Sequence, residues 1–342
     1  AGGHGLEIAQ GAVLLGDLLA VADGLLQVNA LLQVVLQGVE ALLAVLHQVV
    51  DAVKGDAAVV ADDAAAAVGV RQTGEDAGLA AVADADAMIV RSDLVDQEVL
   101  DVAKQLKIVV RAGAGFDNID LNAATAHKIV VMNTPGQNSN AVAELALAMM
   151  VYAYRNFFNG TSGRELRGKR LGIHAFGNVG RNVARIAQGF GMHVLAFDPY
   201  CTDEQIAQAG VEPVHSVEQL YKESDIVSLH IPATAETKNS INYDLLSLMP
   251  KGAMLVNTAR KEVIDEEGLI KLMTERTDFK YVTDVMPACD VRLNELFADR
   301  YFATPKKMGA QTAEANIQAG IAAAKQIVDY FQTGNERFRV NK

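Results

Sequence analysis

The sequence predicts an α/β protein built on a doubly wound parallel sheet. From about residue 84 onward, short runs rich in β-branched residues alternate with helical stretches of roughly ten residues or more, as a parallel sheet with crossover helices requires. Most of these runs lack polar alternation, so we expect helices to cover both faces of the sheet. A glycine-bearing turn at 175–180 lies between a run and a helical stretch, which also fits this fold.

The runs predict strands, in chain order, at 87–91, 107–112, 129–133, 170–176, 193–198, 225–231, 253–259 and 280–285. Two longer helical stretches, 138–158 and 312–333, stand apart from these units. They are suited to cross between two domains. We therefore expect a nucleotide-binding domain at 138–311 and a substrate domain made of 84–137 and 312–342, with a ligand cleft between them.

The first 83 residues are attached to this pattern but do not follow it. Residues 1–53 contain no Lys, Arg or aromatic residue, and 25–53 would form a helix that is apolar nearly all round rather than along one stripe. Three interpretations stay open: a buried or coiled helix, a genuine extra segment, or a start that is mistranslated relative to the gene. We assign no function to this segment.

Composition argues against several classes of function. The 342 residues carry a formal net charge of −12, which disfavours a nucleic-acid partner. Cys201 and Cys289 are too few for a disulfide framework or a zinc site, so we expect no metal and a reducing, cytoplasmic location. No signal peptide and no uninterrupted apolar run long enough to span a membrane are recognisable, so we expect no membrane partner.

The stretch "LGIHAFGNVG" predicts a dinucleotide-binding turn. Gly177 would let the backbone approach a diphosphate, and Gly180 would let helix and strand pack closely. The tight-turn position holds Ala175, which can serve there if its φ stays negative. A helix opening at Asn178 would present free N–H groups to the diphosphate. A purely structural turn is the alternative, because a lone G-x-x-G is weak evidence.

The next strand ends in Asp198, at about the spacing expected of the acidic residue that binds the adenosine ribose. Its carboxylate would accept hydrogen bonds from the ribose hydroxyls and repel a 2′-phosphate. We therefore expect NAD rather than NADP.

Further motifs occur in a characteristic order: "RAGAGFDNIDL", "VMNTPGQNSNAVAELALAMM", "GNVGRNVARIA", "VNTARKEVIDEEGL" and "FATPKKMGAQTAEAN". On these motifs the chain from about residue 84 to its end resembles the D-2-hydroxyacid dehydrogenases, and among them the phosphoglycerate dehydrogenases of the short type without a C-terminal regulatory domain. The resemblance implies a Rossmann NAD-binding domain, a flavodoxin-like substrate domain, a small-molecule substrate and a homodimer. It does not cover the first ~80 residues.

The resemblance carries site residues over position by position. Arg260 in "NTAR" matches the arginine that holds the substrate carboxylate and polarises the carbonyl. It directly follows a predicted strand, where open sheets bind ligands, and a guanidinium can hold a carboxylate with two hydrogen bonds. The residues expected at the cofactor are Ala114, Gly177, Asn178, Val179, Gly180, Asp198, His230, Ile231, Pro232, Thr258, Ala259 and Asp284. Those expected at the substrate are Arg91, Ser92, Ala114 and Gly115. The alternatives are a surface role for Arg260 and a strand-capping role for Asp284.

The chain departs from the family pattern at two positions. Cys289 stands where similar enzymes usually have a Glu, and Lys306 stands where they usually have the catalytic His, with Lys307 one residue on. Some relatives share the lysine form, so Lys306 is the candidate proton carrier. In a closed site beside Arg260 and an oxidised nicotinamide, desolvation and like charge would favour its neutral amine. The alternative is that Lys306 only anchors substrate charge.

Asp290 and Glu295 are the nearest candidates for an acidic partner of Lys306, or else are solvated loop charges. The reading that results is NAD-dependent oxidation of 3-phospho-D-glycerate to 3-phosphohydroxypyruvate, the first step of serine biosynthesis. A dehydrogenase of an unphosphorylated 2-hydroxyacid, such as glycerate or lactate, is the nearest rival. A NAD-sensing corepressor-like binding protein is the rival from another class.

Overall fold

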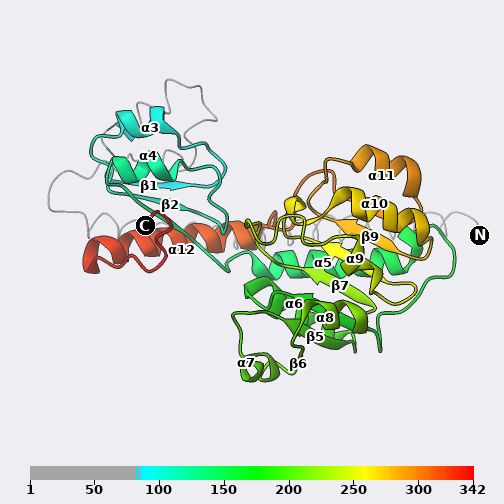
Figure 1. The fold of residues 1–342 in the computed structure, drawn as a ribbon. Coiled ribbons are helices and arrows are strands. Elements are labelled where there is room, and N and C mark those ends of the chain that lie inside the picture. The colour runs from blue at the N-terminus through cyan, green and yellow to red at the C-terminus, as the bar shows by residue number, and fades with distance from the viewer. Residues whose placement is uncertain (1–81, 84) are drawn as a thin grey trace, which may run out of the picture. The chain divides into compact units, whose positions relative to one another are not determined.

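The computed structural model describes residues 82–83 and 85–342, so the interpretations offered for the segment before residue 82 lie outside the described residues. The chain divides into two compact units (Figure 1). The first unit ends at Asn133 and is completed by Gly320–Lys342, and the second unit is Thr134–Ala319. The domain boundaries expected at 138 and 311 stay a prediction.

The first unit contains a parallel sheet of three strands in the order β1-β2-β3, formed by β1 (Ala87–Val90), β2 (Ile108–Arg111) and β3 (Val130–Asn133). Helices α3 (Gln97–Val102) and α4 (Leu121–Ala126) connect these strands. Each helix begins at an aspartate, Asp96 or Asp120, whose carboxylate accepts a hydrogen bond from the backbone N–H three residues on. Because both strand pairs are parallel, all three strands run in one direction, and the loops that follow them lie at one edge of the sheet.

The C-terminal tail completes this sheet. Helix α12 (Ala313–Thr333) precedes it, and Arg339 forms an antiparallel bridge to Met132 of β3. The buried side chain of Asn341 accepts a hydrogen bond from the N–H of Val131 (2.9 Å) and donates one to the carbonyl of Ile129 (2.8 Å). This carboxamide satisfies one backbone group of β3 and one of the residue before it, as a neighbouring strand would.

The second unit contains a parallel sheet of seven strands in the order β10-β9-β8-β7-β4-β5-β6. The strands are β4 (Arg170–His174), β5 (His193–Phe197), β6 (Glu212–Pro213), β7 (Ile226–Leu229), β8 (Met254–Asn257), β9 (Lys280–Thr283) and β10 (Tyr301–Ala303). The chain winds outward from β4 through β5 to β6, then returns to the other side of β4 with β7. The strand order thus reverses between β4 and β7, which is where open α/β sheets bind ligands.

Helices cover both faces of this sheet. Helices α5 (Ser139–Tyr154) and α6 (Asn178–Gly189) pack on one face. The other face carries α8 (Val217–Glu223), α9 (Tyr243–Ser247), α10 (Glu266–Glu275) and α11 (Asp290–Phe297). The shorter elements are α7 (Asp203–Ala207) and the 3-10 turns η1 (Asn156–Phe158) and η2 (Lys261–Val263).

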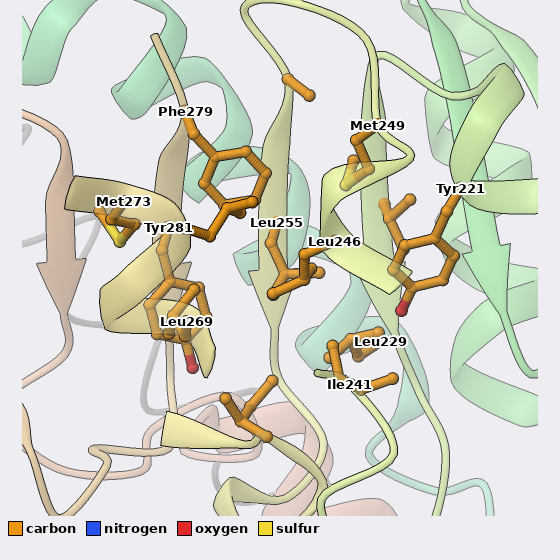
Figure 2. Close-up of a cluster of buried hydrophobic side chains, with 14 of the residues drawn as sticks. Tyr221, Leu229, Ile241, Leu246, Met249, Leu255, Leu269, Met273, Phe279 and Tyr281 are labelled. Carbon is orange, nitrogen blue, oxygen red and sulfur yellow. The ribbon is translucent and has the colours of Figure 1, made fainter. Parts of the chain in front are cut away.

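The alternation of side chains along the central strands builds both cores. In β8, Met254 and Val256 point to the core under α5 and α6, whereas Leu255 belongs to the core on the opposite face. Figure 2 shows the second of these cores, where Leu255 lies among side chains such as Leu246 and Tyr281. Because both sides of each central strand are buried, the strands read as continuous apolar runs in the sequence.

All eight strands expected from the sequence occur, and each is shorter than expected at one or both ends. The sequence missed β6 and β10, which are two and three residues long and form the two edges of the large sheet. The helix expected to run to residue 158 ends at Tyr154 instead, because Asn156, Phe157 and Phe158 have φ values of 49°, 55° and 57°. Left-handed residues cannot continue a right-handed helix.

Within residues 82–83 and 85–342, no helix has the length and apolar character needed to cross a membrane. In the same residues, no group of three or more His, Cys, Asp or Glu side chains is arranged to hold a metal ion.

Candidate functional site

The predicted dinucleotide-binding turn joins β4 to α6. Helix α6 begins at Asn178, as expected, and Gly177 is its N-cap residue. A Cβ added to Gly177 would meet no atom within 4 Å, so the backbone here is open to a ligand. A Cβ added to Gly180 would collide with the carbonyl oxygen of Ala175, so helix and strand pack as closely as a glycine at this position allows. Val179 is half-buried beside them in the first turn of the helix.

The expectation that Ala175 keeps a negative φ is wrong. Its φ is +80°, in the region that favours glycine. Two contacts impose this conformation: the N–H of Ala175 donates to the carbonyl of Phe197 (2.9 Å), and its own carbonyl lies against Gly180. An alanine in this region costs about 1 kcal/mol relative to glycine, which the surrounding structure absorbs.

Asp198 follows β5 directly and lies beside the turn. Its Oδ2 accepts a hydrogen bond from the N–H of Phe176 (2.7 Å), and its Oδ1 accepts one from the N–H of Tyr200 (2.8 Å). The side chain is half-buried. A carboxylate offers about four acceptor positions, so these two bonds leave room for the two hydroxyls of a ribose.

Two histidines meet where the strand order reverses. The N–H of His230, which follows β7, donates to the carbonyl of His174 at the end of β4 (2.9 Å), and the His230 Nε2 pairs with the Ser228 hydroxyl at 3.0 Å. Burial lowers the pKa of His174 to about 4, against an opposing effect of Asp198. Burial, with a smaller contribution from His174, lowers the pKa of His230 to about 3. Both imidazoles are therefore neutral near pH 7. Ile231 is buried beyond His230, and Pro232 is exposed.

The buried His174 predicts sensitivity to acid. Because its pKa falls from 6.5 in the unfolded chain to about 4 in the folded protein, the unfolded chain binds the proton more readily between these values. The stabilisation is complete above pH 6.5 and is lost as the pH falls toward 4, by roughly 3 kcal/mol. Urea unfolding measured from pH 7 to 4 also contains the contribution of His230, whose pKa is lowered further, so we expect His174→Leu to remove about half of the total acid loss. The exposed His193→Gln is the control, and an unchanged acid dependence in His174→Leu would contradict the prediction.

Arg260 lies just beyond the carboxyl end of β8, and a buried asparagine shapes its segment. The Asn257 Nδ2 donates to the carbonyl of Arg260 (2.9 Å), and its Oδ1 accepts from the N–H of Ala259 (3.0 Å). The half-buried guanidinium of Arg260 donates to the carbonyl of Ala259 (3.0 Å). The buried hydroxyl of Thr258 has no hydrogen-bond partner within the described residues, so it is available to a ligand bound beside Arg260. Sequence reasoning missed Asn257, although an asparagine ending the run "MLVN" was a usable signal.

Asp284 follows β9 and is fully buried. Its Oδ1 accepts hydrogen bonds from the Thr304 hydroxyl (2.8 Å) and the N–H of Met308 (2.9 Å), and its Oδ2 accepts one from the N–H of Gly309 (2.9 Å). Lys306 is exposed on the loop between these groups, and Lys307 is exposed next to it. The contact of Asp284 with a nicotinamide ring stays a prediction.

Cys289, in the usual position of the family's Glu, does not supply a charge. It is the residue preceding α11, and its N–H donates to Glu266 of α10 (2.9 Å), as does the N–H of Ala288 (2.8 Å). Burial, reinforced by Glu266, raises the pKa of the Cys289 thiol to about 12. Glu266 was not predicted, although the acidic pair opening "DEEGL" could have indicated it.

Neither suggested acidic partner reaches Lys306. Asp290 accepts a hydrogen bond from the Tyr301 hydroxyl (2.6 Å), and Glu295 is exposed on α11. Within the described part of the chain, neither carboxylate forms an ion pair with Lys306.

The four residues expected at the substrate all lie in the first unit, on loops after neighbouring strands. Arg91 and Ser92 follow β1, and Ala114 and Gly115 follow β2. The last residue of each next strand supports the preceding loop. The Arg111 Nε donates to the carbonyl of Arg91 (3.0 Å), and the Asn133 Nδ2 donates to the carbonyl of Ala114 (2.7 Å). Arg111 thus supports the backbone of Arg91.

Proteins of known family resemble this chain over most of its length. Residues 147–305 match the family of the D-isomer specific 2-hydroxyacid dehydrogenase, NAD binding domain. A crystal structure of NAD+-bound 3-phosphoglycerate dehydrogenase from Entamoeba histolytica has a TM-score of 0.70 and 49% identity, covering 79% of this chain and 86% of that one. A hydroxypyruvate reductase from Thermotoga maritima is 36% identical over 72% of this chain and 85% of its own length.

A D-3-phosphoglycerate dehydrogenase from Methanocaldococcus jannaschii is 37% identical over 72% of this chain. The match covers 50% of that protein, so the chain spans about half the length of this relative. The likeness to the Thermotoga protein extends over most of both chains, and the second unit carries the dinucleotide turn at the reversal of its strand order. The chain therefore belongs to the D-isomer specific 2-hydroxyacid dehydrogenase family, and its second unit contains the NAD-binding domain of that family.

Proposed function

We propose that the protein oxidises 3-phospho-D-glycerate to 3-phosphohydroxypyruvate with NAD, the entry step of serine biosynthesis. The observation that carries this proposal is the 49% identity with the 3-phosphoglycerate dehydrogenase of Entamoeba histolytica, which extends over most of that chain. The retained Arg260 and a lysine on the loop after β10 support a working enzyme rather than a binding protein.

The residues of the second unit fit the cofactor. The backbone at Gly177 is open, the N-terminus of α6 follows it, and Asp198 keeps free acceptor positions beside the turn. The unpartnered hydroxyl of Thr258 is a further polar group for the ligand. When bound there, NAD would supply the hydride acceptor for C2 of the substrate.

The chain's own residues would bind the hydroxyacid and move its proton. A guanidinium is always charged and offers a planar fork, so Arg260 would hold the carboxylate with two hydrogen bonds. Lys306 would take the proton from the C2 hydroxyl during oxidation and return it in the reverse direction. Arg91 and Ser92 would bind the phosphate, and the N–H groups of Ala114 and Gly115 would support the carboxylate.

Cofactor choice provides one test. We expect NAD to be preferred over NADP by more than ~10-fold in kcat/KM, about 1.4 kcal/mol, because a 2′-phosphate would lie against the Asp198 carboxylate. Steady-state kinetics with both cofactors measures this ratio. Asp198→Ser should shrink the ratio, whereas Asp203→Ser on the exposed side of α7 should leave it unchanged. Equal efficiency with the two cofactors in the wild type would refute the assignment of Asp198.

Phosphate recognition provides a second test. We expect Arg91→Ala to raise KM for 3-phosphoglycerate by at least ~10-fold but to change KM for unphosphorylated glycerate little, because only the former loses a charge-assisted contact. Initial-rate kinetics with both substrates measures the effect. Lys107→Ala, which removes a cation before β2, is the control. Equal effects of Arg91→Ala on both substrates would assign Arg91 a structural role.

The second candidate is a dehydrogenase of an unphosphorylated 2-hydroxyacid. The similarity to the Thermotoga hydroxypyruvate reductase over 85% of its length favours it. Comparing kcat/KM for 3-phosphoglycerate with that for glycerate and lactate decides between the two. NAD binding without turnover of any of these would instead favour a corepressor-like protein. The homodimer is a family expectation, which sedimentation of the purified protein tests, and the cytoplasmic location is an expectation from the low cysteine content.

A further inference from the structure

The buried carboxylate of Asp284, which the family pattern places near the nicotinamide, takes no part in the proton transfer proposed above, yet it is costly to keep. Its side chain is fully buried, and within the described residues no Lys, Arg or His forms an ion pair with it. Burying a carboxylate requires compensating hydrogen bonds. Three donors provide them, at 2.8–2.9 Å. The donors share one property: all of them belong to the segment 304–309.

This segment is wrapped around the carboxylate. The N–H of Thr304 donates to the carbonyl of Thr283 (3.0 Å), which continues the ladder between β9 and β10. The Thr304 hydroxyl and the N–H of Met308 then share the Oδ1 of Asp284, so 305–307 form a closed loop. At Gly309, an added Cβ would lie 3.0 Å from the Asp284 Oδ2 and 3.3 Å from Val142 of α5, so the end of the loop fits tightly. Lys306 lies between the two points at which the loop is held.

The same carboxylate is connected to the segment of Arg260. The backbone N–H of Asp284 donates to the carbonyl of Asn257 (2.9 Å), and the side chain of Asn257 binds the carbonyl of Arg260 (2.9 Å). A continuous set of hydrogen bonds therefore runs from Arg260 through Asn257 and Asp284 to the loop that bears Lys306. Hydrogen bonds between buried groups are directional, so they fix the spacing of the segments they join.

We propose that Asp284 is a positioning residue, which holds the loop of Lys306 at a set place relative to Arg260. The inference rests on the proposed function, because it takes Lys306 as the proton carrier. Asp284 acts through the three donors of its loop and need not touch the cofactor. Its loss should therefore affect the step that uses Lys306 and leave NAD binding in place.

A double-mutant cycle in the full-length enzyme tests this inference. Asp284→Asn keeps the size of the side chain but turns an amide N–H toward the N–H of Gly309. The hydrogen bond that holds the end of the loop is then replaced by a repulsive contact between two donors. We expect kcat to fall at least ~30-fold with the Kd for NAD within ~3-fold of the wild type. In a Lys306→Ala background, the same change should lower kcat by less than ~3-fold, because the group that it positions is already absent.

The outcomes separate this inference from the function on which it rests. If Lys306→Ala keeps more than ~10% of kcat, Lys306 is not the proton carrier and the positioning role falls with it, whereas oxidation of 3-phosphoglycerate stands. If the wild-type enzyme does not oxidise 3-phosphoglycerate, the proposed function itself falls. If Lys306→Ala lowers kcat at least ~100-fold but Asp284→Asn lowers kcat by the same factor in both backgrounds, only the positioning role is refuted. A Kd for NAD raised more than ~10-fold in Asp284→Asn, with kcat unchanged, would overturn positioning in favour of a nicotinamide contact.

Milder variants keep the test decisive if Asp284→Asn does not fold. Thr304→Val removes one of the three donors without changing shape, and we expect kcat to fall ~3- to 10-fold with NAD affinity unchanged. Thr304→Ser keeps the hydroxyl and should restore near wild-type kcat. Thr274→Val, which removes a hydroxyl hydrogen bond of 2.8 Å on α10, is the matched control. Wild-type kcat in Thr304→Val, or equal loss in Thr304→Ser, would overturn the proposal.

Discussion

Replacing Lys306 with Ala is expected to lower kcat for hydroxyacid oxidation at least ~100-fold while the Kd for NAD changes little. Oxidation at C2 requires a base for the hydroxyl proton, and the histidine that usually serves is absent: the last histidine of the chain is His230, which is neutral and hydrogen-bonded to Ser228. Lys306 is exposed on the loop held by Asp284, where a bound substrate could reach it. Pre-steady-state and steady-state rates measure the first effect, and isothermal titration calorimetry measures the Kd for NAD.

Lys307→Ala is the matched control for this prediction, because it removes the same charge one residue further along the same loop. Its kcat should remain close to that of the wild type. The wild-type oxidation rate should also rise toward alkaline pH, since an amine acts as a base only in its neutral form. Residual kcat above ~10% in Lys306→Ala, or a greater loss in the Lys307 variant, would show that the proton carrier is assigned wrongly.

Replacing Arg260 with Lys is expected to lower kcat/KM at least ~100-fold, although the charge is kept. A lysine offers a single point charge, whereas a guanidinium binds both oxygens of a carboxylate and fixes the plane of the substrate. The backbone at Arg260 is itself held by Asn257, so a shorter or differently shaped head group cannot be corrected by a shift of the loop. Steady-state kinetics with the preferred hydroxyacid measures the loss.

Arg292→Lys provides the comparison for Arg260. Arg292 is an exposed residue of α11 paired with Glu267 at 2.8 Å, so the same conservative exchange should there leave kcat/KM near the wild-type value. If Arg260→Lys loses less than ~3-fold, the substrate carboxylate is bound by another group.

Local patterns were sufficient to predict most elements and the cofactor turn. Central parallel strands are buried on both faces, so they appear as continuous apolar runs and all eight were found. Strands β6 and β10 were not found because two or three residues at a sheet edge carry no periodicity to detect. The start of α6 at Asn178 and the place of Asp198 followed from the spacing of glycines and acid, since that spacing is set by the covalent chain.

The conformation of Ala175 was decided by packing. Its φ of +80° results from a hydrogen bond to Phe197 and from the carbonyl that lies against Gly180, and both constraints come from elements brought together by the fold. An alanine in isolation avoids this region. The sequence therefore indicated the turn but pointed to the wrong backbone conformation within it.

The sequence by itself determined the fold class, the family and the residue types available for chemistry: the dinucleotide turn, Asp198, Arg260 and a lysine in place of the usual histidine. Only the tertiary structure decided which groups hold them. Asp284 binds donors 20 to 25 residues away, and Glu266 binds the N–H of Cys289, 23 residues away. Such partners meet because the sheet places β8, β9 and β10 side by side. Strand order arises from burial and hydrogen bonding of the whole unit, so no local pattern encodes it.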